Sequence, residues 1–198
     1  MFSFTQFSGK NMLIDLSVKV SKFARKEATN NEKMVSFGHL GTHFDVMNKE
    51  FPLLYTKRMG IVFDVSGASN EDIELSDNDL LKVHQDMFVA FHSGFIDQVE
   101  YGTKPYFREH PQLSNTLIDK LLDKGVSIIG IDFTGIRRGK EHTPKDQYCA
   151  DKGVFIVENL CNLAQVLNDK KYNNFIANTY PINFEGMTGL PCRVVAEV

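Results

Sequence analysis

Short apolar runs alternate with polar stretches along most of the 198-residue chain. Apolar runs that are rich in β-branched side chains are typical of buried strands. One such run, residues 61–65, is interrupted by Asp64. The pattern predicts strands at residues 12–16, 35–40, 61–65, 87–91, 126–131, 154–157 and 193–198.

Helical periodicity is clearest over residues 115–124. Ser114 is a suitable N-cap for this helix, and Gly125 stands where the C′ residue belongs. Shorter helices are expected over residues 77–84 and 159–167. The long helix carries one apolar stripe, formed by Leu117, Ile118, Leu121 and Leu122.

Strands and helices are mixed along the chain rather than segregated. Residues 87–131 contain at least one strand–helix–strand segment, which is typical of α/β proteins. A chain of 198 residues fits one domain and can bury about 70% of the surface of its unfolded form. The sequence has no internal repeat, low-complexity tract or linker. We therefore expect one α/β domain that spans residues 1–198.

The segment His39-Leu40-Gly41-Thr42-His43-Phe44-Asp45 places two imidazoles and a carboxylate close together. Neutral imidazole and carboxylate are common protein ligands for zinc, manganese and iron(II). Three such ligands with an open coordination position make a catalytic metal site, in which a bound water becomes a nucleophile near neutral pH. The segment therefore predicts a metal-dependent hydrolase. The alternative is two ordinary histidines that happen to lie near an aspartate.

The spacing of this segment indicates how its ligands converge. On a helix His39 and His43 would share a face, but Gly41 followed by β-branched Thr42 disfavours a helix. In a straight strand the two histidines would lie about 13 Å apart, since each residue advances the strand by roughly 3.3 Å. That separation is too long for Zn–N bonds of about 2.0–2.1 Å. We therefore expect a bend or bulge at Gly41 that turns both imidazoles inward.

Composition and charge narrow the class of protein. A net charge of −3 argues against nucleic acid as a partner. The basic cluster of Arg137-Arg138 with Lys140 is interpreted as a solvated loop, because Glu141 follows it at once. Three cysteines without a C-x-x-C spacing fit a reducing compartment. No stretch approaches the ~20 apolar residues of a membrane span, so we expect a cytoplasmic protein that does not bind membranes.

Glu158 follows a predicted strand and is a second candidate for the site. A charged residue directly after an apolar run can point into a site, but it can equally mark the end of the strand or cap the next helix. The sequence leaves both interpretations open. His142 and Asp146 are expected in a polar loop just upstream and can reach the same place.

Lys49 is a third candidate, because it lies four residues after Asp45. Beside a divalent cation, a lysine can act as a general base or stabilise an oxyanion. The alternative is an ordinary solvated side chain. The sequence alone does not separate these roles.

The metal-ligand segment resembles the signature H-x-G-T-H-x-D-x-P-x-H of the metal-dependent cyclase and kynurenine-formamidase-like hydrolase family, which includes isatin hydrolase. The chain matches this signature from His39 through Asp45. Five other segments also resemble the family: Ile14-Asp15-Leu16-Ser17, Val62-Phe63-Asp64-Val65, Ser93-Gly94-Phe95, Gly130-Ile131-Asp132 and Val157-Glu158-Asn159-Leu160. The resemblance spans most of the chain.

The resemblance implies a swivelling β/β/α fold, a divalent metal (zinc or manganese), and hydrolysis of amide or cyclic amide bonds. By motif position, His39, His43 and Asp45 resemble the ligands of the first metal. Glu158 matches a ligand of the second metal in those family members that hold one.

The chain departs from the family at two positions, one that serves proton transfer and one that binds the second metal. The last motif histidine, usually given a base or proton-shuttle role, is Lys49 here. The family tends to place a ligand histidine some eleven or twelve residues before the late glutamate. In this chain those positions are Gln147 and Asp146, and the nearest histidine is His142.

We therefore expect a single-metal hydrolase that acts on an amide, a cyclic amide or a similar small acyl compound. Zinc or manganese would be its cofactor, and Lys49, Glu158 or Asp146 would carry out the proton transfer. A small-molecule substrate is the expected partner, and a homo-oligomer is the expected assembly. The alternative is a non-catalytic, metal-binding family member with a structural or ligand-sensing role, which the loss of the last motif histidine favours.

Overall fold

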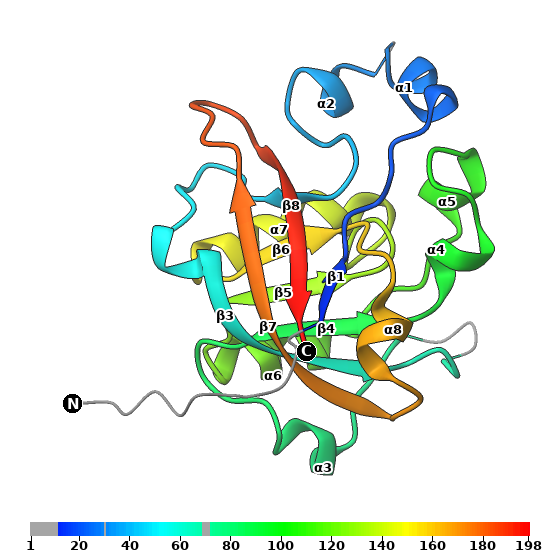
Figure 1. Ribbon diagram of the computed structural model, residues 1–198. Coiled ribbons are helices and arrows are strands. Elements are labelled where there is room, and N and C mark those ends of the chain that lie inside the picture. The colour runs from blue at the N-terminus through cyan, green and yellow to red at the C-terminus, as the bar shows by residue number, and fades with distance from the viewer. Residues whose placement is uncertain (1–11, 30, 69–71) are drawn as a thin grey trace.

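The computed structural model describes residues 12–29, 31–68 and 72–198. Within them, one mixed sheet closes on itself into a ring of seven strands (Figure 1). The order around the ring is β8–β2–β6–β5–β4–β3–β7, and β7 pairs with β8 to close it. An eighth strand, β1, pairs with the C-terminal part of β8. The strands are β1 (Leu13–Asp15), β2 (His43–Asp45), β3 (Lys57–Asp64), β4 (Phe88–His92), β5 (Ile128–Ile131), β6 (Phe155–Glu158), β7 (Tyr172–Pro181) and β8 (Gly189–Glu197).

Helical segments connect the strands. Strands β3, β4, β5 and β6 are parallel neighbours, so the chain must cross over between them, as in α/β proteins. The longest crossover contains the predicted helix, which begins after the N-cap Ser114 and ends before Gly125 at a φ of +67°. The helical segments are α1 (Lys22–Ala28), α2 (Glu32–Val35), η1 (Leu53–Thr56), α3 (Asp77–Leu80), α4 (Phe95–Gln98), α5 (Lys104–Arg108), α6 (Asn115–Asp123), η2 (Gly139–Glu141), α7 (His142–Asp151) and α8 (Leu163–Leu167).

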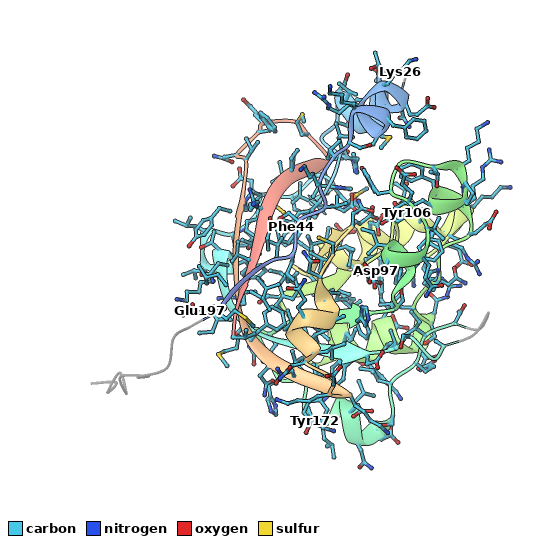
Figure 2. The ribbon with its side chains drawn as sticks, turned by 45° about the vertical axis from the view of Figure 1, so that its right-hand side comes forward. Lys26, Phe44, Asp97, Tyr106, Tyr172 and Glu197 are labelled. Atoms are coloured by element: carbon cyan, nitrogen blue, oxygen red, sulfur yellow. The ribbon has the colours of Figure 1, made fainter. Side chains whose placement is uncertain are left out.

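Alternate residues of the ring strands face two different apolar cores, because successive side chains of a strand point to opposite faces. On β4, Phe88 and Ala90 belong to the inner core, which also contains side chains of β7, β8 and α8. Val89 and Phe91 belong to the outer core, in which the leucine stripe of α6 packs. Phe44 of β2 lies in the inner core and is fully buried (Figure 2).

The α/β class and most of the predicted strands are confirmed, but three segments differ. Residues 35–40 form no strand, because α2 ends at Val35 and the chain then bends with Gly38 at a φ of +82°. The helix predicted over residues 77–84 is shortened to α3. The helix predicted over residues 159–167 begins only at Leu163, since Asn162 has a φ of +57°.

Helix α7 and strand β7 are among the elements that were not predicted. Helix α7 buries only Asp146, Cys149 and Ala150, so its sequence lacks an apolar stripe. Strand β7 begins with Tyr172-Asn173-Asn174, and the asparagines hide its alternating pattern. No helix in the described part of the chain is long and apolar enough to cross a membrane.

Candidate metal centre

Strand β2 presents two of the predicted metal ligands on one face. It lies between β6 and β8 and is antiparallel to both. His43 and Asp45 share the outer face, whereas Phe44 between them points into the inner core. His43 stands directly opposite Glu158 of β6, and paired residues of adjacent strands project to the same face. The pairing therefore brings Glu158 to the two ligands of β2.

The bend expected at Gly41 is present, and it brings His39 back to the strand. Gly41 has a φ of +78°, a backbone conformation that glycine adopts readily. Nδ1 of His39 lies 3.1 Å from Nε2 of His43 and 3.0 Å from Oδ1 of Asp45. Nε2 of His43 lies 3.6 Å from the same Asp45 oxygen. The three side chains predicted from the motif therefore converge.

Buried hydrogen bonds hold this bend in place. The Thr42 hydroxyl donates to the Asn159 carbonyl and accepts from the Val18 backbone N–H, each at 2.8 Å. The Asn159 amide donates to the Gly41 carbonyl at 2.9 Å, and the Tyr106 hydroxyl donates to Asn159 Oδ1 at 2.8 Å. The Gly-Thr pair of the motif is thus a structural requirement of the site. The tyrosine gave no signal in the sequence.

Helix α7 adds His142 and Asp146 to the cluster. They are four residues apart, so they lie on one face of the helix. Nε2 of His142 lies 3.2 Å from Asp146 Oδ2 and 3.1 Å from Glu158 Oε1. The sequence placed both residues near the site but in a polar loop. The loop assignment was wrong, and the helix is what aligns the two side chains.

Glu158 is buried and its carboxylate is held from two sides. The Gly135 backbone N–H donates to Oε1 at 2.6 Å, and the Thr134 hydroxyl donates to Oε2 at 3.0 Å. Oε2 also lies 3.6 Å from Nε2 of His43. Glu158 therefore faces the cluster.

Arg137 anchors the loop that supplies these two donors. Its guanidinium contacts Asp72 Oδ2 at 2.5 Å, Glu141 Oε2 at 2.7 Å and the Leu113 carbonyl at 2.7 Å. The side chain is almost fully buried. The interpretation of this basic segment as a solvated loop was therefore wrong at Arg137, although Arg138 is exposed.

The donor atoms form two groups that share Asp45. One group contains His39, His43 and Asp45, and the other contains Asp45, His142 and Asp146, with the atoms of each group within 4.8 Å of one another. A tetrahedral zinc with bonds of about 2.0–2.1 Å separates its ligand atoms by about 3.3 Å. The first group has separations of 3.0, 3.1 and 3.6 Å. The residues present therefore fit a divalent metal.

Asp45 has a buried oxygen that a cation would satisfy. Its Oδ2 is buried and accepts no hydrogen bond from the described residues, which is costly for a carboxylate. Burial acts to raise the pKa of the Asp45 carboxyl, but hydrogen bonds from His39 and His43 outweigh it and hold the pKa well below its usual value. Asp45 is therefore a carboxylate at neutral pH.

Contacts behind the imidazoles determine which ring nitrogen faces the cluster. Nδ1 of His43 donates to the Gly41 carbonyl at 2.9 Å, so the neutral imidazole would present the lone pair of Nε2 to a metal. Nε2 of His39 lies 2.8 Å from the Thr188 hydroxyl, which leaves Nδ1 for the cluster. Such contacts typically orient metal-binding histidines. Thr188 lies 149 residues from His39, and nothing in the sequence identified it.

A cavity of about 370 Å³ opens beside the cluster. This volume is near the lower end for small-molecule sites, which typically measure about 300–1,000 Å³. The cavity wall includes His110, which is buried and stacks on Phe133. Burial lowers the pKa of His110 to about 4, so this imidazole is neutral. From the cluster, the cavity is lined by His39, His43, His142 and Glu158.

The structure does not bring Lys49 to the cluster. The chain turns after β2, with Met47 at a φ of +57° and the Lys49 backbone N–H donating to the Val46 carbonyl at 3.0 Å. The Lys49 ammonium instead lies 2.7 Å from Asp151 Oδ1, at the end of α7. The expectation that Lys49 lies near the metal is corrected: the turn directs it to the surface.

Comparison with known proteins identifies the family. A sequence model described as Putative cyclase matches residues 14–137, which is more than half of the chain. The chain belongs to the cyclase family. A comparison with curated proteins finds no significant match.

Solved structures share the cyclase-family fold over nearly the whole chain. One is a potential metal-dependent hydrolase with cyclase activity, at 19% identity and a TM-score of 0.70, covering 94% of this chain and 98% of that chain. Another is isatin hydrolase A from Labrenzia aggregata bound to benzyl benzoate, at 17% identity and a TM-score of 0.71, covering 95% and 94%. At such identities the likeness establishes the fold.

Proposed function

We propose that this cyclase-family protein is a metal-dependent hydrolase that acts on an amide, a cyclic amide or a similar small acyl compound. The observation that carries the proposal is the group of His39, His43 and Asp45, with its buried and unsatisfied Asp45 oxygen, beside a cavity of substrate size. The description of two proteins of the same fold as hydrolases supports it.

His39, His43 and Asp45 would hold a divalent metal, zinc or manganese. The metal would supply Lewis-acid polarisation of the substrate carbonyl and a water nucleophile near neutral pH. Asp45 also belongs to the group with His142 and Asp146, so the same carboxylate can serve a second ion. Asp146 would then fill the place of the missing family histidine.

We assign the transfer of the proton to Glu158. It lines the cavity, and its Oε2 lies 3.6 Å from the metal-facing nitrogen of His43. A carboxylate at this place can take a proton from water and return it to the leaving nitrogen. The Gly135 N–H and the Thr134 hydroxyl keep it oriented while it does so.

An activity screen tests this function. The chelator-treated protein is supplied with zinc or manganese and assayed against formamides, cyclic imides and lactams. We expect metal-dependent turnover of at least one class, and its loss in His43→Ala. Tight metal binding without turnover of any class would overturn the hydrolase and favour a non-catalytic, ligand-sensing protein.

A further inference from the structure

Two cationic side chains line the cavity, and they come from a part of the chain that is remote in sequence from the metal ligands. Lys104 and Arg108 both line it, from helix α5. They are four residues apart, so they lie on one face of the helix. Both are exposed, and within the described residues neither forms an ion pair with a carboxylate. An anion that enters the cavity therefore meets two charges that the protein leaves without an internal partner.

Helix α5 is fixed relative to the metal ligands. Tyr106 lies between the two cations in the sequence and is fully buried, and its hydroxyl donates to Asn159 Oδ1 at 2.8 Å (Figure 2). Asn159 in turn supports the bend at Gly41 that carries the histidine ligands. This chain of contacts holds Lys104 and Arg108 at a defined place relative to the cluster. A cation on such an anchored helix is a better binding group than one on a free surface loop.

Few other charges of the wall oppose this pair. His110 is neutral, and Glu158 is the carboxylate of the lining, already held by Gly135 and Thr134. Glu100 and Glu109 flank the helix in the sequence, but neither lines the cavity. The apolar part of the lining, Met34 and Phe107, comes from α2 and α5, which also share a smaller adjoining cavity of about 140 Å³.

We infer that the substrate carries a carboxylate remote from the bond that is hydrolysed, and that Lys104 and Arg108 bind it. This inference rests on the proposed function, because the cluster defines where the acyl group lies. The planar fork of an arginine suits a carboxylate, and a lysine adds a point charge. In a cavity of about 370 Å³, a carboxylate also leaves more room for a ring or short chain than a larger phosphate or sulfonate would.

A matched pair of substrates tests the inference. para-Formamidobenzoate carries the anion opposite its formamide, and its methyl ester is neutral but otherwise similar. For the zinc- or manganese-loaded protein we expect kcat/KM to be roughly fivefold higher for the acid, since exposed ion pairs contribute modestly. The preference should vanish in Lys104→Met/Arg108→Met and reverse in Lys104→Glu/Arg108→Glu.

The control is Lys57→Glu/Lys170→Glu, which makes the same charge change at exposed positions outside the cavity. It should keep the preference of the wild type. Turnover of both compounds with equal kcat/KM would overturn the inference and leave the hydrolase intact. If neither compound is hydrolysed, calorimetric binding of the same pair decides: tighter binding of the acid that Lys104→Met/Arg108→Met abolishes supports the inference, and equal binding overturns it.

Discussion

His43 and Glu158 stand directly opposite one another where β2 pairs with β6, and Nε2 of His43 lies 3.6 Å from Oε2 of Glu158. This register joins the metal-ligand segment, residues 39–45, to the later segment Glu158-Asn159-Leu160. A slip of one residue would turn the ligands of β2 into the inner core and Phe44 outward. Because Phe44 is fully buried in that core, the apolar packing enforces the geometry of the cluster.

Glu158→Gln should weaken metal binding far more than folding. The amide keeps the shape of the side chain but removes the charge that faces His43 and His142. We expect metal affinity to fall about 10- to 100-fold, as for other residues that support metal ligands. Calorimetric titration and thermal unfolding measure the two effects, with exposed Glu50→Gln as the control. A loss of thermal stability at unchanged affinity would make Glu158 purely structural.

The two groups that share Asp45 predict how much metal each variant binds. Asp146→Asn should remove binding by the group with His142 and leave the His39–His43 group occupied. Asp45→Asn should weaken binding by both groups, since Asp45 belongs to each. Metal content after dialysis measures this. Equal metal content in Asp45→Asn and Asp146→Asn would show that Asp45 is not shared.

Metal binding should release protons at neutral pH. Burial lowers the pKa of His142, but the hydrogen bond and charge of Glu158, together with Asp146, outweigh it and raise the pKa to about 9. The metal-free imidazole is therefore protonated at neutral pH, and a ligand must lose that proton. Affinity should rise with pH until about pH 9.

Calorimetric titration of the metal into the protein, in buffers of different ionisation enthalpy, measures how many protons are released on binding. We expect His142→Asn to release about one proton fewer than the wild type. Identical proton release in the two proteins would exclude His142 as a ligand.

The sequence allowed the metal segment to be predicted because its determinants are local. His39, His43 and Asp45 lie in one short segment, and Gly41 between them permits the bend that their convergence requires. Helix α6 was predicted for a similar reason, since its cap, its stripe and its C-terminal glycine lie within a dozen residues of one another. Such features depend little on the rest of the fold.

The remaining parts of the site depend on contacts between distant segments. Thr188 reaches His39 only because β8 pairs with β2. Helix α7 buries Asp146, Cys149 and Ala150 rather than an apolar stripe, so periodicity could not reveal it. Lys49 was assigned to the site from its spacing after Asp45, but the turn at Met47 sends it elsewhere.

Lys49→Met should leave metal affinity and turnover unchanged. Its ammonium is paired with exposed Asp151 and is absent from the cavity wall. Loss of a surface ion pair should lower the free energy of unfolding by at most about 1 kcal/mol. Activity and thermal unfolding check this. A loss of turnover with unchanged metal content would show that Lys49 acts in the site.

Arg137→Met should destabilise the fold and disturb Glu158. The guanidinium contacts two carboxylates and the Leu113 carbonyl, and its loss leaves that carbonyl without this donor. We expect the free energy of unfolding to fall by about 2 kcal/mol. Exposed Arg138→Met is the matched control and should change it by less than about 0.5 kcal/mol. Equal effects of both substitutions in denaturant titrations would contradict the anchoring role.

The proposed metal centre is tested most directly by titrating zinc or manganese into chelator-treated protein while metal content and hydrolysis are followed in the same samples. The wild type should gain activity in proportion to the metal that it binds. The His39→Ala/His43→Ala variant should bind less metal and remain inactive. Equal metal content in the two proteins, or activity that persists in the variant, would contradict the assignment of the cluster as the catalytic metal site.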